Sequence, residues 1–292
     1  MTKIAVVSTS DRTYGVNKSL DLLGTNPVKG KNVILKPNFN TADPPPASSS
    51  METVRQLVLK IKEMHAESIT IAERAGPAKT SEVFKKVGLN ELAEELDFKV
   101  VDLTNVSKDD YILKNPEGNH WKNGFLFAKI YDEAECIVET CCLKTHMYGG
   151  HFTMSLKNAV GTVNKKNMSE LHSSIHQRDM IAEINSVYKP DLVVMDGVIA
   201  FVDRGPMEGT RVEANVFVAG TDKIAIDVVG VAILRILGTT PEVTNGSIFE
   251  QEQIKRAIEL NLGIKGPSDI EFLTDSKESK ALVLKIKQEL TK

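Results

Sequence analysis

The side chains best suited to chemistry gather in one stretch of the chain, residues 144–176. Four of the six histidines of the protein lie there, and Lys144 and Lys157 add two amino groups to the same stretch. Imidazoles exchange protons near neutral pH and bind metals, whereas the ammonium group of lysine attracts anions. The stretch therefore predicts a pocket that binds a carboxylate or phosphate beside titratable imidazoles.

Two glycines in this stretch favour close contact with a ligand. Gly149 and Gly150 have no side chain, so the backbone there can approach a bound molecule or adopt a positive φ angle. The apolar pattern of residues 152–160 predicts a helix. The free N–H groups of its first turn, near Thr153, would face the same space and favour an anion.

Three histidines form a predicted set of metal ligands, His146, His172 and His176. His172 and His176 are four residues apart, a spacing that places two imidazoles on one face of a helix, where they can bind one metal ion. The alternative is a solvated loop, because residues 164–170 are polar.

Further polar groups follow the predicted strands. Lys36 lies at the end of a strand at 32–37, and Asn38 follows it. Glu73 and Arg74 follow a strand at 68–72, and Lys144 and His146 follow one at 135–143. Asp196 ends the apolar run of a strand at 191–199. In open α/β sheets, ligands bind at the carboxyl ends of the strands. We therefore expect these groups to meet in one site.

The sequence also predicts a role for each group. The expected catalytic residues are His146, Lys157 and Asp196. His146 would act as an acid or base, Lys157 would anchor an anion or a cofactor, and Asp196 would be their carboxylate partner. The residues expected to bind a cofactor are Lys36, Asn38, Lys144, Asn158, Gly149, Gly150 and Arg204. Arg204 lies in a loop rich in glycine and proline, where it would clamp an anion; the alternative is a plain turn. Asp227 lies inside an apolar run and needs a buried partner, for which a lysine or histidine of the central cluster is a candidate.

Short β-rich runs alternate with helical stretches along the chain. This alternation predicts an α/β fold with a mostly parallel sheet, helices on both faces and some antiparallel additions. We expect a single domain over residues 1–292, with a hairpin inserted near 104–130, where Asn115-Pro-Glu-Gly118 has turn chemistry. The expected strands are 4–8, 32–37, 68–72, 98–103, 125–130, 135–143, 191–199, 215–219 and 270–273. The expected helices are 17–23, 51–65, 81–87, 152–160, 177–188, 222–237, 251–260 and 277–290.

The composition argues against several classes of protein. A formal charge of −3 and an aromatic content of 5% provide neither a basic face nor a stacking surface for nucleic acid. No apolar run reaches the roughly 20 residues that a bilayer span needs. The first residues are typical of a strand rather than of a signal peptide. We therefore expect a cytoplasmic protein that binds neither nucleic acid nor membranes.

The three cysteines, Cys136, Cys141 and Cys142, lie in or beside one apolar run. Their odd number and the lack of a C-x-x-C pair argue against disulfides and against zinc or iron–sulfur sites built from cysteine. Buried core positions are one interpretation. The alternative is a metallochaperone that binds soft metals through Cys141, Cys142 and the histidines.

Several motifs resemble, in order, those of the family called domain of unknown function 362 (DUF362). They are Lys36-Pro-Asn-Phe-Asn40, Lys144-Thr-His146, Ser155-Leu-Lys-Asn158 with Gly161, Asp196-Gly197, Gly205-Pro-x-x-Gly209 and Gly220-x-Asp222. Many members of that family are fused to ferredoxin-type iron–sulfur modules or occur beside them. The resemblance therefore implies redox work with a ferredoxin-like partner, although this chain lacks the ferredoxin cysteines.

A weaker resemblance links the chain to the nickel-pincer lactate racemases. In that family a histidine, a glycine-rich turn, a cofactor-bearing lysine and a later histidine occur in this order, and His146, Gly149-Gly150, Lys157 and His172 are similar in order and spacing. The glycine-rich run before the lysine is replaced by Thr153-Met-Ser-Leu. The resemblance implies that Lys157 and the histidines line a pocket.

Taken together, these features predict an enzyme that acts on a small anionic molecule by redox or isomerase chemistry. The cofactor is left open, with a transition metal as one alternative. The competing hypothesis is a non-catalytic module that binds a ligand or passes electrons in an iron–sulfur system.

Overall fold

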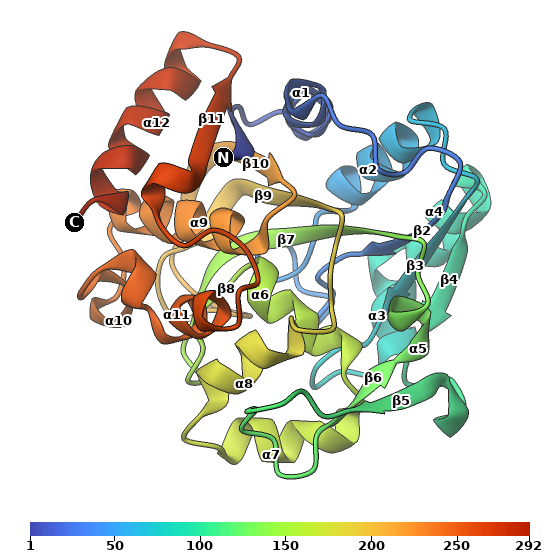
Figure 1. Cartoon of the computed structure of the whole chain (residues 1–292). Coiled ribbons are helices and arrows are strands. Elements are labelled where there is room, and N and C mark those ends of the chain that lie inside the picture. The colour runs from blue at the N-terminus through green and yellow to red at the C-terminus, as the bar shows by residue number, and fades with distance from the viewer.

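One mixed β-sheet runs through the protein and has helices on both of its faces (Figure 1). The computed structural model describes all residues, 1–292. The strand order is β11-β1-β10-β9-β7-β2-β3-β4, and β8 pairs with β7 outside this row. The strands of this sheet are β1 (Thr2–Ser8), β2 (Asn32–Lys36), β3 (Ser68–Glu73), β4 (Lys99–Asp102), β7 (Cys136–His146), β8 (His151–Thr153), β9 (Leu192–Phe201), β10 (Arg211–Gly220) and β11 (Ile270–Thr274).

Most neighbouring strands in the sheet are parallel. The pairs β1–β11, β9–β7, β7–β2, β2–β3 and β3–β4 are parallel, whereas β10 is antiparallel to β1 and β9, and β8 is antiparallel to β7. The two longest strands of the parallel part, β7 and β9, are buried along almost their whole length, because helices cover both faces of the sheet. The predicted α/β class with antiparallel additions is confirmed.

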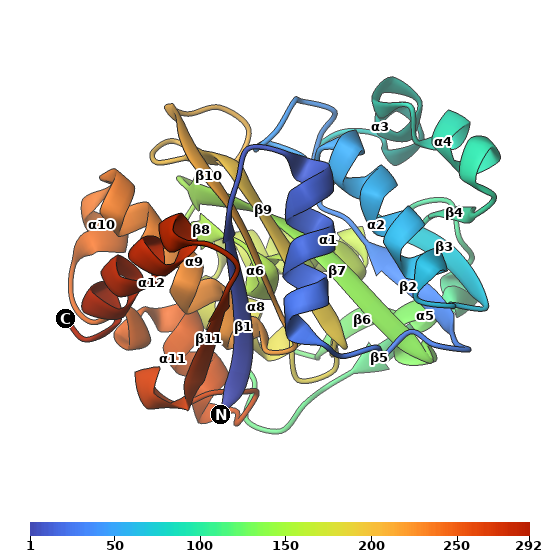
Figure 2. The same ribbon diagram turned by 90° about the horizontal axis from the view of Figure 1, so that it is seen from above.

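The helices form two layers (Figures 1 and 2). Helices α1 to α4 pack over one face of the sheet, and α6, α9, α11 and α12 contribute to the core on the other. None of the helices is long and apolar enough to cross a membrane. The helices are α1 (Arg12–Leu23), α2 (Met51–Glu63), α3 (Thr80–Val87), α4 (Leu89–Leu96), α5 (Lys129–Asp132), α6 (Ser155–Asn158), α7 (Met168–Ser173), α8 (Gln177–Ile184), α9 (Lys223–Leu237), α10 (Pro241–Thr244), α11 (Glu252–Glu259) and α12 (Lys277–Leu290).

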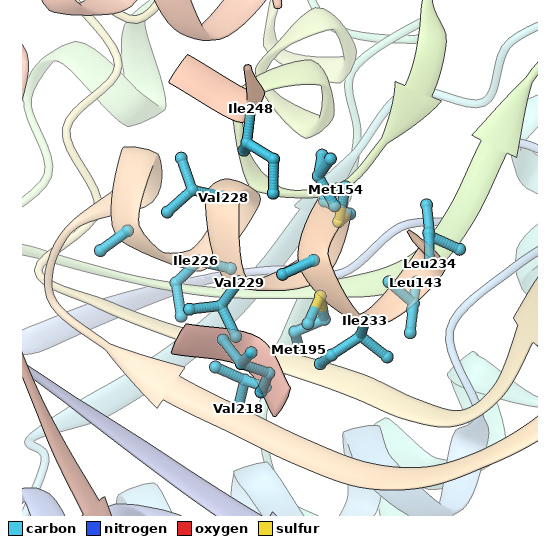
Figure 3. Close-up of a cluster of buried hydrophobic side chains, with 14 of the residues drawn as sticks. Leu143, Met154, Met195, Val218, Ile226, Val228, Val229, Ile233, Leu234 and Ile248 are labelled. Carbon is cyan, nitrogen blue, oxygen red and sulfur yellow. The ribbon is translucent and has the colours of Figure 1, made fainter. Parts of the chain in front are cut away.

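Helix α9 lies at the centre of the largest hydrophobic cluster (Figure 3). Twelve of its residues are buried, as expected for a helix that is apolar all round. The carboxylate of Asp222 caps it by accepting a hydrogen bond from the N–H of Ala225 at 2.9 Å. In the cluster, Val229 lies close to Val218 and Met195 of the sheet, so α9 is fixed against the strands that precede it.

Residues 152–160 do not form the single helix that their apolar pattern predicts. The chain turns back at Gly149, where φ is +80°, and His151–Thr153 becomes β8, paired antiparallel with residues 144–146 of β7. The short helix α6 and a 3₁₀ turn at 159–162 follow. Pairing with the long strand β7 therefore overrides the local helical pattern.

The predicted hairpin near 104–130 is present as two antiparallel strands, β5 (Tyr111–Lys114) and β6 (Phe125–Ala128). They form a separate two-stranded sheet and do not extend the main one. Helix α1 begins at Arg12, earlier than predicted, because the carboxylate of Asp11 caps it through the N–H of Tyr14. Helix α4 has no counterpart among the predicted helices.

Asp196 lies in the middle of β9, because the strand continues to Phe201. Its buried carboxylate accepts hydrogen bonds from Arg12 Nε at 2.9 Å and from Thr53 Oγ1 at 2.6 Å. The N–H of Val198 donates a third bond at 3.0 Å. Asp196 thus fixes the first turns of α1 and α2 to the central strand.

We predict that Asp196→Asn lowers the free energy of unfolding by roughly 3 kcal/mol, because the partly buried Arg12 loses the charge of its buried partner. Urea denaturation checks this, with Asp109→Asn, at an exposed position, as a control expected to stay within about 0.5 kcal/mol of the native protein. An unchanged unfolding free energy in Asp196→Asn would contradict this structural role.

Candidate functional site

A cavity of about 760 Å³ lies at the carboxyl ends of β2, β3 and β7. Its opposite wall comes from the segment that runs from α6 to the first residue of α8. The volume is in the range of sites that enclose small molecules, about 300–1,000 Å³. The side chains and glycines that line it include Lys36, Asn38, Glu73, Arg74, Lys144, His146, Gly149, Lys157, Asn158, Gly161, Lys165, His172 and Gln177.

Positive charge dominates the lining of the cavity. Five cationic side chains face a single carboxylate, that of Glu73. This carboxylate is fully engaged: Oε2 accepts hydrogen bonds from Lys36 Nζ at 2.8 Å and from the N–H of Phe39 at 3.1 Å, and Oε1 accepts one from the N–H of Arg74 at 2.8 Å. The remaining cations therefore have no carboxylate of the protein to neutralise them.

The Lys36–Glu73 ion pair is closed to ligands. Lys36 Nζ also donates to the carbonyl of Pro37 at 2.9 Å and to Asn158 Oδ1 at 3.2 Å, so all three of its protons are used. A side chain at Gly161 would clash with the pair, since its Cβ would lie 2.7 Å from Lys36 Nζ. The pair thus joins β2, β3 and the end of α6.

A second chain of hydrogen bonds connects α6 to β7. Asn158 Oδ1 accepts from Asn38 Nδ2 at 3.0 Å, and Asn38 Oδ1 accepts from Lys144 Nζ at 2.7 Å. Lys144 Nζ also donates to the carbonyl of Ala47 at 2.6 Å, which leaves one of its protons free. Burial lowers the pKa of Lys144.

Arg74 holds the far wall of the cavity in place. Its guanidinium donates to the carbonyls of Val160 and Val163, both at 2.8 Å, and to that of Ala75 at 3.1 Å. These bonds tie the end of β3 to the 3₁₀ turn that follows α6. The Arg74 side chain therefore has a structural role, because its guanidinium is bound to backbone carbonyls.

Lys157 differs from the other buried cations of the cavity because its ammonium group makes no hydrogen bond to the protein. Burial, followed by the charges of Lys144 and Arg74, lowers the pKa of Lys157 to about 8. A buried ammonium group without partners is stabilised by an anion from outside. Lys157 is thus the strongest anion-binding group that the cavity offers.

His146 lies beside Lys157, and its imidazole is in the neutral form. Burial lowers the pKa of His146 well below 6.5, with further contributions from Lys157 and Lys144. Its Nδ1 atom is buried and has no hydrogen-bond partner. A neutral imidazole with a free ring nitrogen can accept a proton from a ligand or bind a metal.

Gly150 packs against both of these side chains. A Cβ atom on Gly150 would lie 3.0 Å from His146 Nδ1 and 3.1 Å from Lys157 Cε. The glycine pair therefore allows the turn after β7 to close over the amine and the imidazole. Gly149 lines the cavity itself, and its Cβ would lie 2.3 Å from Gln177 Oε1.

The position of α6, and with it Lys157, depends on Asp227 of helix α9. The Asp227 carboxylate is fully buried and accepts hydrogen bonds from the N–H of Ser155 at 2.7 Å and of Leu156 at 3.2 Å. Asn185 adds a bond to the carbonyl of Leu156 and accepts one from Lys223. The buried partner expected for Asp227 thus consists of backbone N–H groups rather than a histidine or lysine of the central cluster.

The structure brings together eight of the residues to which the sequence analysis assigned a catalytic or binding role. Lys36, Asn38, Lys144, His146, Gly149, Lys157, Asn158 and His172 all line the cavity. Gly150 lies directly against two of them, whereas Asp196, Arg204 and His176 do not line it. Arg204 is exposed and bonds to Asp203 and Thr210 of its own loop.

His172 and His176 do not share a helical face. Helix α7 ends at Ser173, and His176 is the N-cap residue of α8, so a break separates the two imidazoles. His172 lines the cavity and its Nδ1 lies 3.1 Å from Gln177 Nε2, whereas His176 stacks on His120 outside it.

None of the three cysteines lines the cavity. Cys136, Cys141 and Cys142 are all buried. Burial raises the pKa of Cys142 to about 11 and that of Cys141 as well, so both remain protonated thiols at neutral pH. Soft-metal binding needs thiolates, and these positions do not favour them.

The model of the family described as "Domain of unknown function (DUF362)" matches residues 33–232. The chain belongs to the DUF362 family. The matched range begins in β2 and ends in α9, and it contains every residue that lines the cavity. The DUF362 region is therefore the part of the chain that builds the site.

Two similar proteins provide further comparison. A thylakoid-associated protein of Synechocystis sp. is 26% identical over 219 residues, which cover 71% of this chain and 64% of that protein. The chain thus spans less than two thirds of the length of this relative. The lactate racemase apoprotein of Thermoanaerobacterium thermosaccharolyticum has a similar fold, with a TM-score of 0.51 and 16% identity over 76% of this chain and 55% of that one.

Some residues of the DUF362 site had no predicted catalytic or binding role. Glu73, Arg74, Gly161, Lys165 and Gln177 line the cavity without an assigned role. The position of Glu73 and Arg74 after a strand predicted that they would lie at the shared edge of the sheet, where they are found. The need for glycine at position 161 became apparent only from its contact with the Lys36–Glu73 pair.

We predict that Gly150→Ala weakens anion binding while the protein stays folded, because the added methyl group displaces His146 and Lys157. Calorimetry with sulfate measures the binding. Gly266→Ala is the matched control, since a Cβ there meets nothing within 4 Å. Equal sulfate affinity in Gly150→Ala and the native protein would contradict the geometry.

The pKa of Lys157 predicts the pH dependence of anion binding. Below a pKa of about 8 the amine is protonated and attracts an anion, and above it the attraction is lost, so sulfate affinity is expected to fall as the pH rises through about 8. Calorimetric titrations across this range check the profile. Lys157→Met should abolish the step, and a step that persists in this variant would assign it to another group.

Proposed function

We propose that this protein is an enzyme that acts on a small anionic molecule, with Lys157 as the anion-binding group and His146 as the proton acceptor. The proposal depends on one observation: the amine without partners and the neutral imidazole lie side by side under Gly150, in a cavity with a surplus of positive charge. Such a pair can bind a carboxylate or phosphate and remove a proton from the atom next to it.

The first step is binding. The Lys157 ammonium group forms a charge-assisted hydrogen bond with the substrate anion, and the free proton of Lys144 contributes a second donor from β7. Lys165 is exposed at the edge of the cavity, and its charge attracts the anion as it enters. Burial makes each of these interactions stronger than it would be in water.

The second step is proton transfer. His146 is neutral, so it can accept a proton from a carbon or hydroxyl group of the bound anion. Once protonated, the imidazolium is stabilised by the substrate anion held beside it. The fold is shared with a lactate racemase, whose substrate is a small 2-hydroxycarboxylate, and this favours isomerisation at the carbon next to a carboxylate.

The donor set is also compatible with a transition metal or a metal-bearing cofactor. His146 has an unpartnered ring nitrogen, Lys157 an unpartnered amine, and His172 lines the same cavity. These residues would hold such a group, which would supply an electron sink for the reaction. The cavity is larger than a three-carbon acid needs, which leaves room for a cofactor beside the substrate.

The test separates binding from catalysis. The purified protein is incubated in D₂O with a panel of 2-hydroxycarboxylates, and NMR follows exchange of the C2 proton. Lys157→Met should weaken substrate binding by about 10- to 100-fold, the value of a hydrogen bond to a charged group. His146→Gln should retain binding and lose exchange, because the neutral imidazole contributes no charge to binding.

Lys166→Met, an exposed neighbour outside the cavity, is the control and should behave as the native protein. Undiminished binding by Lys157→Met would refute the assignment of the anion site. Binding without exchange for every substrate would favour the alternative of a non-catalytic module that binds a ligand or serves a redox partner.

A further inference from the structure

A second cluster of metal-binding side chains lies outside the cavity. His120 comes from the connection between β5 and β6, His176 is the N-cap residue of α8, and Asp179 lies in the first turn of that helix. Their potential ligand atoms lie within 4.8 Å of one another. The two imidazole rings are stacked, with centroids 4.2 Å apart and planes inclined by 23°.

The His120 ring is oriented by a buried carboxylate. Its Nδ1 lies 2.6 Å from Glu183 Oε1, and its backbone N–H donates to Glu183 Oε2 at 2.9 Å. The Glu183 side chain is only 1% exposed and is held in turn by Arg256, which donates to Oε1 from Nε at 3.1 Å and from Nη2 at 3.0 Å. The proton of His120 therefore stays on Nδ1, and the Nε2 lone pair is free.

This arrangement is the one in which proteins hold a metal-binding histidine. A carboxylate that accepts the proton of one ring nitrogen fixes the ring and raises the basicity of the other. The two remaining groups are accessible, since the side chains of His176 and Asp179 are 48% and 29% exposed. An ion can thus reach the cluster from solvent.

We propose that His120, His176 and Asp179 bind one divalent transition-metal ion. Two imidazole nitrogens and one carboxylate oxygen suit Zn²⁺, Ni²⁺ or Cu²⁺, whereas Mg²⁺ and Ca²⁺ prefer oxygen ligands. Ligand atoms about 2.1 Å from a tetrahedral Zn²⁺ lie roughly 3.4 Å apart, so the exposed His176 ring moves inward on binding. Three protein ligands leave a coordination position open for water or for a further ligand.

The bound ion links the β5–β6 connection, which does not line the cavity, to an element that contributes to the cavity wall. It joins the β5–β6 connection to the start of α8, where Gln177 contacts His172 and lines the cavity. Binding of the ion to the folded state alone raises the stability of the protein. The proposal is independent of the function proposed for the cavity, because no residue of this cluster lines it.

Calorimetric titration of the full, chelator-treated protein with Zn²⁺ tests the site. The native protein should show a binding event that is absent with Mg²⁺. His120→Ala and His176→Ala should each weaken it by at least about tenfold and remove the increase in Tm that Zn²⁺ produces. Measurements of Tm in chelator establish that each variant is folded.

Two variants serve as controls. His65→Asn changes another exposed histidine, at a φ of +66° that asparagine accepts, and should bind Zn²⁺ as the native protein does. His146→Gln removes the cavity imidazole and should leave this binding event intact. The proposal is overturned if the native protein does not bind Zn²⁺, if His120→Ala and His176→Ala bind it undiminished, or if the event is lost in His146→Gln.

Discussion

The carboxylate of Glu73 is the constraint on which the candidate site depends. It is the only acidic group lining the cavity, and it accepts hydrogen bonds from Lys36 and from the N–H groups of Phe39 and Arg74. This buried ion pair joins the ends of two strands to Asn158 and forces glycine at position 161. Because breaking a buried pair leaves an uncompensated charge, the pair holds the edge of the sheet in one arrangement.

The use of Glu73 as a structural partner determines the chemistry of the rest of the cavity. With Glu73 engaged, Lys157 and one proton of Lys144 have no partner in the protein, and their burial makes an external anion the natural counterion. Burial, followed by the same positive surroundings, lowers the pKa of His146 and keeps it neutral. Anion binding and the capacity of His146 to accept a proton thus have one electrostatic origin.

The sequence predicted the parts of this structure that depend on local pattern or on strand direction. Strand ends in a parallel sheet meet at one edge, and Lys36, Lys144 and His146, which follow from this rule, line one cavity. Asp196 was misplaced, because an apolar run does not show where a strand ends or which face a side chain points to. The single helix predicted over residues 152–160 was wrong, because two long-range contacts determine their structure. These are the pairing of β8 with β7 and the hydrogen bond from the N–H of Ser155 to the carboxylate of Asp227.

The most direct measurement is a crystal structure of the protein grown with selenate, a tetrahedral oxyanion whose selenium is located by anomalous scattering. The account predicts an oxyanion inside the cavity, with one oxygen at hydrogen-bond distance from Lys157 Nζ and with the Lys36–Glu73 pair intact. Selenate bound only on the outer surface, with water alone around Lys157, would contradict it.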